Sequence, residues 1–89
     1  MNDVMTYVTM GGEIVGRLKE ELDDRLIIEN PRVFAATPEG AAFVPGVCMT
    51  GEKELSECEV MKTGVILISR TDPQIVKAWQ QQTSGLVLP

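Results

Sequence analysis

Two adjacent glycines near the amino terminus constrain the fold of this chain more than any other feature. Gly11 and Gly12 separate segments 4–10 and 13–21, in which apolar and polar residues alternate. Alternation with a period of two is typical of half-buried β-strands. Glycine adopts a positive φ at no steric cost, and a two-residue hairpin loop requires such a φ. The pattern therefore predicts that these two segments form an antiparallel hairpin.

Gly16, in the middle of the second segment, predicts a sharp bend. A glycine inside a strand has no side chain to pack, and it usually marks a bend or the close approach of another backbone. An acidic break at residues 20–24 follows, and a third strand begins at Arg25. A bent antiparallel meander of this kind is typical of the beginning of a small β-barrel.

The rest of the chain supplies further strand patterns. Asn30-Pro31 interrupts the third segment, because proline cannot donate to a ladder, and Pro38 and Gly40 fit a type I turn. Residues 65–68 are four consecutive aliphatic side chains. They predict a strand covered on both faces, with one face packed into the barrel and the other covered by a neighbouring subunit or by a carboxyl-terminal helix. In full, strands are predicted over 4–10, 13–21, 25–34, 43–50, 55–62 and 64–70.

The sequence after the last strand predicts a helix over residues 73–82. Asp72 is a good N-cap and Pro73 fits the first helical position. Trp79 falls at helical spacing from the apolar pair 75–76, which predicts a core residue, and a platform for base stacking is the alternative. A short last strand over 74–79 is the alternative, but glutamine and alanine are poor strand residues. The apolar tail 86–88 is expected to pair as an edge strand or to dock on a neighbour.

Composition limits the classes of function that the chain can have. Its 89 residues predict one domain over 1–89, and an aromatic fraction of 4% predicts a thin core that oligomerisation would complete. The net charge of −5 argues against a broad phosphate-binding face and against an anionic membrane surface. The chain has no histidine, which removes the commonest general base and zinc ligand. We expect no enzyme activity, no cofactor and no metal site, with the acidic residues of 20–24 solvated.

The cysteines and the amino-terminal charge pattern predict a soluble cytoplasmic protein. Cys48 and Cys58 are expected to be thiols in a reducing compartment, and a disulfide between them is the alternative. No basic residue precedes Arg17, so the signature of a signal peptide is missing. The longest strongly apolar run, 65–68, is too short to cross a bilayer.

The glycine-bent hairpin resembles the first motif of the Sm-like (LSm) proteins. That motif has a turn glycine, a bending glycine two residues before a leucine, a loop aspartate and an aliphatic strand. The matching positions are Gly12, Gly16, Leu18, Asp23 or Asp24, and 26–28.

The second motif of the family is an aliphatic strand that ends in arginine-glycine. Ile68-Ser69-Arg70 is similar, with Thr71 in place of the glycine. The family usually has an asparagine four residues after its loop aspartate, and here those positions hold Ile27 or Ile28.

The resemblance implies an all-β, small, strongly bent Sm-like/SH3-like barrel with a short carboxyl-terminal helix. It also implies a closed homo-oligomeric ring that binds single-stranded RNA through loops lining its pore. The candidate RNA-binding residues are Arg70, Asn30, Arg32 and Asp24. An alternative for Arg70 is a rim arginine paired with Asp72.

Other functions stay open. The chain also resembles small Sm-like proteins encoded by phages, which implies the cytoplasm of an infected bacterium. The acidic charge and the missing aspartate/asparagine pair favour a rival function, a ring-shaped interaction or assembly module that binds no nucleic acid. An SH3-like accessory domain of an enzyme is a third alternative.

Overall fold

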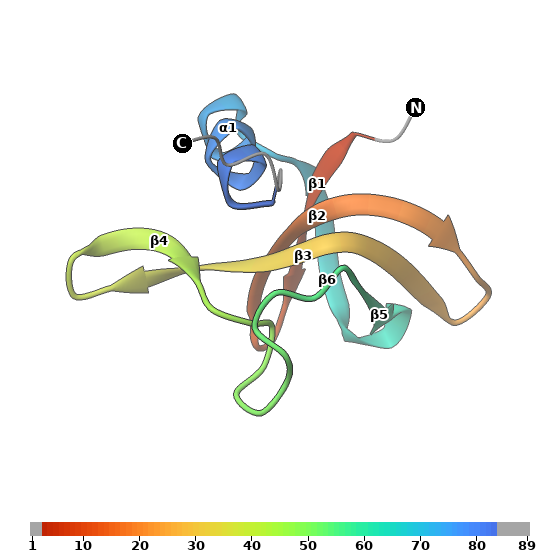
Figure 1. Ribbon diagram of the computed structural model, residues 1–89. Coiled ribbons are helices and arrows are strands. Elements are labelled where there is room, and N and C mark those ends of the chain that lie inside the picture. The colour runs from red at the N-terminus through yellow and green to blue at the C-terminus, as the bar shows by residue number, and fades with distance from the viewer. Residues whose placement is uncertain (1–2, 84–89) are drawn as a thin grey trace.

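The computed structural model describes residues 3–83, which form a β-sheet followed by one helix (Figure 1). A 3₁₀ helix, η1 (Lys62–Gly64), joins the last two strands, and α1 (Pro73–Thr83) follows them. The predicted all-β fold class with one carboxyl-terminal helix is confirmed. The predicted tail strand 86–88 lies outside the described residues. The strands are β1 (Val4–Thr9), β2 (Gly12–Glu21), β3 (Arg25–Thr37), β4 (Gly40–Val44), β5 (Glu57–Met61) and β6 (Val65–Arg70).

The first hairpin forms as predicted, with its loop one residue earlier. Thr9 pairs with Gly12, so the loop is Met10 and Gly11. The Thr9 hydroxyl accepts a hydrogen bond from the Gly11 N–H at 3.1 Å and donates to the Gly12 carbonyl at 3.0 Å. Gly12 has a φ of 134°, which an L side chain rarely adopts. Its position at the end of the loop explains why glycine is needed there.

The bend predicted at Gly16 coincides with a break in the β2–β3 register. The pairing shifts between Val15 and Arg17, and it shifts again between Leu18 and Glu20. Such bulges bend a strand and increase its twist. A Cβ atom at Gly16 would collide with Cγ2 of Ile28 and lie 2.9 Å from the Glu29 carbonyl oxygen. The predicted close backbone approach is therefore confirmed.

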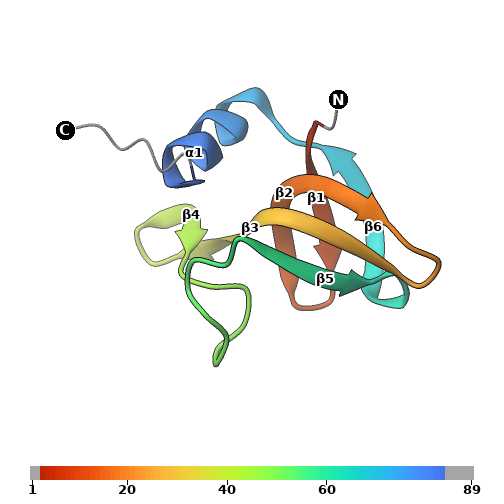
Figure 2. The same cartoon turned by 45° about the vertical axis from the view of Figure 1, so that its right-hand side comes forward.

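The sheet has two edges that carry no further strand within residues 3–83. Its order is β4-β3-β2-β1-β6, and β5 pairs with the first part of β3 beside β4. Figure 2 shows β2 and β3 curving through the body of the molecule, with β6 on one side and the β3–β4 hairpin extending away from it. Because no ladder joins β5 to β6 in this part of the chain, the margin of β6 and the margin shared by β5 and β4 are both open.

The core has two parts on opposite faces of the sheet. Adjacent side chains of a strand point to opposite faces, so the neighbours Ile14 and Val15 belong to different clusters. The first cluster is Tyr7, Leu26, Ile28 and Val60. In the second cluster, α1 covers Val4 and Val15 with Trp79, which is 2% exposed.

Three predicted strands have other boundaries in the structure. The strand predicted over 43–50 is β4, which ends at Val44 because Pro45 has no N–H for the ladder. The strand predicted over 55–62 is β5, which is shorter: it begins at Glu57 and ends at Met61, because η1 begins at Lys62.

The strand predicted over 25–34 continues through Asn30-Pro31 to Thr37. Asn30 has a φ of 49°, and its N–H donates to the Ser56 carbonyl at 2.8 Å. The left-handed conformation of Asn30 allows the strand to continue after Pro31.

The prediction that both faces of 65–68 are covered is wrong for the single chain. Ile66, Leu67 and Ile68 are 59%, 50% and 49% exposed. Ile68 pairs with Tyr7 and Leu67 with Val8, so the two side chains lie on opposite faces. The helix covers neither of them, because it packs on the second cluster. Coverage by a neighbouring copy stays a prediction.

The predicted helix is confirmed, and the alternative of a last strand over 74–79 is wrong. The Asp72 carboxylate accepts a hydrogen bond from the Gln74 N–H at 2.8 Å, and the Asp72 carbonyl accepts one from the Val76 N–H at 2.9 Å. These bonds satisfy amino-terminal donors of the helix. Cys48 and Cys58 are both free thiols, so the disulfide alternative is not formed here.

Candidate nucleic-acid interface

Arg70 is the last residue of β6, and its side chain is exposed. It lines a cleft of about 340 Å³ with Asp3, Val4, Thr71, Pro73 and Val76. Within the described residues no ion pair joins Arg70 to Asp72, whose carboxylate instead caps the helix. Arg70 therefore borders a cleft beside the exposed strand, and its carboxylate neighbour in that cleft is Asp3.

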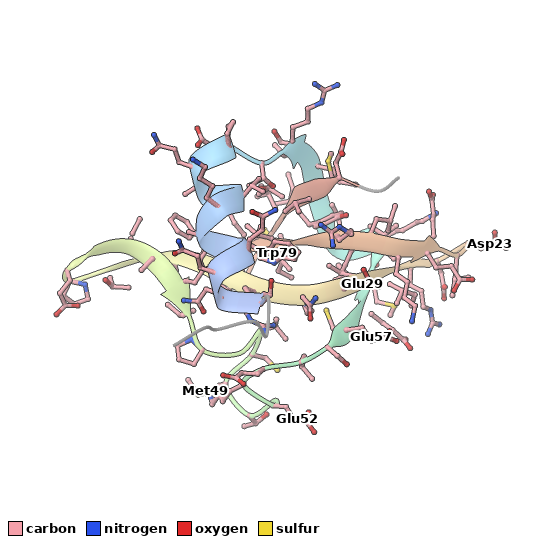
Figure 3. The ribbon with its side chains drawn as sticks, turned by 45° about the horizontal axis from the view of Figure 1, so that its top comes forward. Asp23, Glu29, Met49, Glu52, Glu57 and Trp79 are labelled. Carbon is pink, nitrogen blue, oxygen red and sulfur yellow. The ribbon has the colours of Figure 1, made fainter. Side chains whose placement is uncertain are left out.

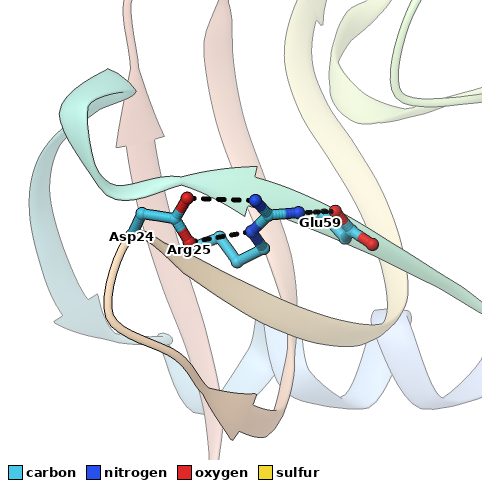
Figure 4. A network of polar contacts seen from close by, with 3 residues as sticks. All are labelled: Asp24, Arg25 and Glu59. Carbon is cyan, nitrogen blue, oxygen red and sulfur yellow. Dashed lines mark hydrogen bonds and ion pairs between the residues drawn. The ribbon is translucent and has the colours of Figure 1, made fainter.

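Asp24 lies in the β2–β3 turn, where its carboxylate binds Arg25 through two hydrogen bonds of 2.9 and 3.0 Å (Figure 4). Arg25 also donates to Glu59 of β5 at 2.7 Å. The hydrogen bonds from Arg25 hold the pKa of the Asp24 carboxyl below its usual value. Because these contacts connect the turn to β5, Asp24 is engaged in an intramolecular network on the surface.

Arg32 is buried, with 7% of its surface exposed. Its Nη1 donates to the carbonyl oxygens of Pro31 at 2.8 Å and Leu55 at 3.0 Å. A buried charge must be satisfied by such contacts. The guanidinium therefore anchors the loop before β5 to β3 and offers little surface to a ligand.

Asn30 is half-buried and takes a left-handed conformation that few residues other than glycine adopt. Its carbonyl accepts a hydrogen bond from the Trp79 indole N–H at 2.9 Å. The main chain of Asn30 is thus held from two sides, by Ser56 and by α1.

The four predicted residues do not meet in one site. Asn30 and Arg32 belong to β3, and β2 and β1 lie between them and Arg70. Asp24 lies in the turn between β2 and β3, immediately before the first residue of β3.

Two residues that the sequence did not single out meet Asn30 in a groove of about 280 Å³. They are Arg17 of β2 and Gln80 of α1, and the groove is completed by Trp79 and Thr83. No local motif could have indicated this grouping, because the residues come from three elements far apart in the chain. Figure 3 shows Trp79 between α1 and the sheet, where it is 2% exposed.

Other kinds of site find no support in the part of the chain that is described. Within it, no three histidine, cysteine, aspartate or glutamate side chains gather to hold a metal ion. Among residues 3–83, no helix combines the length and apolar character needed to cross a membrane. No protein-family model, curated protein or solved structure matches the chain.

Proposed function

We propose that this chain assembles into a closed homo-oligomeric ring of the Sm-like type and binds single-stranded RNA. The observation that carries the proposal is β6. It is an edge strand with an open margin, and it exposes apolar side chains on both faces. Unpaired edges of this kind are templates for pairing with another chain.

The two open margins differ, which favours a head-to-tail arrangement. One margin is β6, and the other consists of β5 and β4 along β3. Pairing unlike margins of successive copies makes a heterologous interface, which closes into a ring when the rotation fits. Such pairing would also complete the curled sheet as a barrel wall.

The apolar residues of β6 would supply much of the interface energy. Fully burying one Ile or Leu side chain stabilises by about 1.5–3 kcal/mol. Because Ile66, Leu67 and Ile68 are about half exposed, covering them contributes roughly 1 kcal/mol each, or roughly 3 kcal/mol per interface. Replacing Ile68 with lysine should therefore dissociate the assembly, whereas replacing exposed Met49 with lysine should leave it intact. A wild-type chain that is already monomeric would contradict the ring.

RNA binding is proposed from the place of Arg70 and from the family resemblance. Arg70 ends β6 and is exposed, so every copy would bring one guanidinium to the same level of the ring. Arginine binds phosphate bidentately and stacks on bases.

Titration of a labelled uridine-rich oligomer at low and moderate salt tests this proposal. Arg70→Ala should weaken binding about tenfold, as expected for loss of a charge-assisted contact. Lys77→Ala, which removes the same charge from an exposed position of α1, is the matched control. Equal binding by both variants would refute the role of Arg70.

A second candidate is a ring that acts as an interaction or assembly module without nucleic acid. The net charge of −5 favours it, and so does the engagement of Asp24 with Arg25. A multi-subunit particle that leaves the oligomer unbound at low salt would select this function. For either function, the resemblance to phage-encoded members extends the proposal to the cytoplasm of an infected bacterium.

A further inference from the structure

The groove between α1 and the sheet is lined by polar side chains and one tryptophan, and by no acidic side chain. Its lining residues are Arg17, Asn30, Trp79, Gln80 and Thr83, around a volume of about 280 Å³. They offer a guanidinium and two carboxamides, while the Thr83 hydroxyl donates to the Trp79 carbonyl at 2.9 Å, and none of the five is acidic. In a chain of net charge −5, a groove lined by hydrogen-bond donors without a carboxylate is suited to an anionic or nucleotide ligand.

Arg17 is oriented by the tryptophan beneath it. Its guanidinium carbon lies 5.3 Å from the centroid of the Trp79 ring, within the range of a cation–π interaction. The indole is buried, and its N–H is bonded to the Asn30 carbonyl. The ring is therefore fixed, and it limits the orientations of the guanidinium. A guanidinium has five N–H donors in a planar fork, so it can serve more than one acceptor.

Asn30 is oriented by its backbone. Its φ of 49° is a sparsely populated conformation for residues other than glycine, and such conformations concentrate at functional sites. The N–H bond to Ser56 and the carbonyl bond from Trp79 hold the residue in place. Within residues 3–83, no hydrogen bond of the structure engages the Asn30 carboxamide, which lies at the groove.

Glu29 places a negative charge beside the groove. It is the cross-strand neighbour of Arg17, although it does not line the groove. Figure 3 shows Glu29 and Glu57 on neighbouring strands, and Glu57 is paired with Lys19 at 2.8 Å. Glu29 therefore weakens the positive potential near Arg17, which makes it a useful position for testing charge.

We propose that this groove binds one nucleotide of single-stranded RNA, with Arg17 donating to the phosphodiester and Asn30 and Gln80 donating or accepting at the base or ribose. The inference rests on the proposed RNA-binding function and adds a contact beside the second half of α1, whereas Arg70 lies beside its first half. A volume of about 280 Å³ suits a single nucleotide rather than a longer segment.

The test is titration of a labelled hexauridylate, read by anisotropy and by the emission of Trp79, the single tryptophan of the chain. Because Trp79 forms the base of the groove, bound RNA should change its emission. Arg17→Gln should weaken binding about tenfold or more. Gln80→Ala, at an exposed helical position that tolerates alanine, should weaken it several-fold. The matched control is Gln81→Ala, on the same helix but outside the groove, which should bind like the wild type.

Two further variants separate chemistry from folding. Asn30→Gly keeps the left-handed backbone without strain and removes only the carboxamide, so it should weaken binding while the fold stays intact. Glu29→Gln removes the neighbouring negative charge and should strengthen binding, most clearly at low salt.

Each outcome decides between the two proposals. If Arg70→Ala weakens binding while Arg17→Gln and Gln80→Ala do not, the groove is wrong and the proposed function stands. If the wild type binds no hexauridylate, the proposed function fails and the groove assignment with it. If inorganic phosphate alone changes Trp79 emission at the concentrations where RNA does, the groove is an anion site and the nucleotide assignment is overturned.

Discussion

Replacing Gly16 with alanine tests the bend of β2, on which the shape of the sheet depends. The added methyl group would collide with Cγ2 of Ile28, which is 0% exposed, and would lie 2.9 Å from the Glu29 carbonyl oxygen. Overpacking of this kind costs about 1–3 kcal/mol, and the reduced entropy of the unfolded chain offsets about 0.4–1 kcal/mol.

The expected loss in the free energy of unfolding is therefore about 1–2 kcal/mol. For a domain of this size it should lower Tm by about 4–16 °C, measured by circular dichroism at a fixed protein concentration.

Gly64→Ala is the matched control, because a Cβ atom at Gly64 would have no atom within 4 Å. It should leave Tm unchanged or raise it slightly. A second comparison uses Ile28→Ala, which removes the methyl group that the new Cβ atom meets. The double variant should lose less free energy of unfolding than the sum of the losses of the two single variants. Strict additivity, or a Gly16→Ala protein as stable as the wild type, would refute the close-approach argument.

Four other predictions concern polar groups of the core and the two thiols. Tyr7→Phe removes a hydroxyl that has no hydrogen-bond partner in the described structure, and it should raise the free energy of unfolding by about 1 kcal/mol in urea denaturation. Arg32→Ala leaves the Pro31 and Leu55 carbonyls without their donor, and it should lower that free energy by about 2 kcal/mol; a loss below about 0.5 kcal/mol would contradict the anchoring role. Burial raises the pKa of Cys58 from 9.0 to about 11 and that of Tyr7 from 10.0 to about 12. Because both groups lose their protons at a lower pH in the unfolded chain than in the folded chain, the free energy of unfolding should be unaffected below pH 9 and should fall between pH 9 and 12. At pH 8, iodoacetamide should modify the exposed Cys48 before Cys58.

Local signals in the sequence predicted most of the fold. The Gly11-Gly12 pair placed the first hairpin within one residue, and Gly16 marked the bend. Asp72-Pro73 placed the start of the helix, because an N-cap and a first-turn proline act through contacts within a few residues. Such features need no knowledge of distant parts of the chain.

Other features depend on contacts between distant residues. The burial of Arg32 depends on the Leu55 carbonyl, 23 positions away. The groove with Arg17 and Gln80 requires β2, β3 and α1 to pack together, and no spacing in the sequence records that packing. The candidate site was therefore predicted only in part, through Asn30.

The exposure of β6 shows the same limit in another form. The aliphatic run 65–68 predicted a strand covered on both faces, and the single chain leaves 66–68 about half exposed. The hydrophobic pattern predicts that these side chains are buried, but it does not identify the molecule that buries them. A second copy is the cover that we propose.

The mass of the particle in solution tests this account most directly. Multi-angle light scattering across a hundredfold range of concentration should give a whole-number multiple of the chain mass, with one value throughout and no ladder of larger species. Ile68→Lys should reduce that mass to the value of one chain. A wild-type protein that has the mass of a single chain at every concentration would contradict the claim that the margins of this sheet are completed by copies of itself.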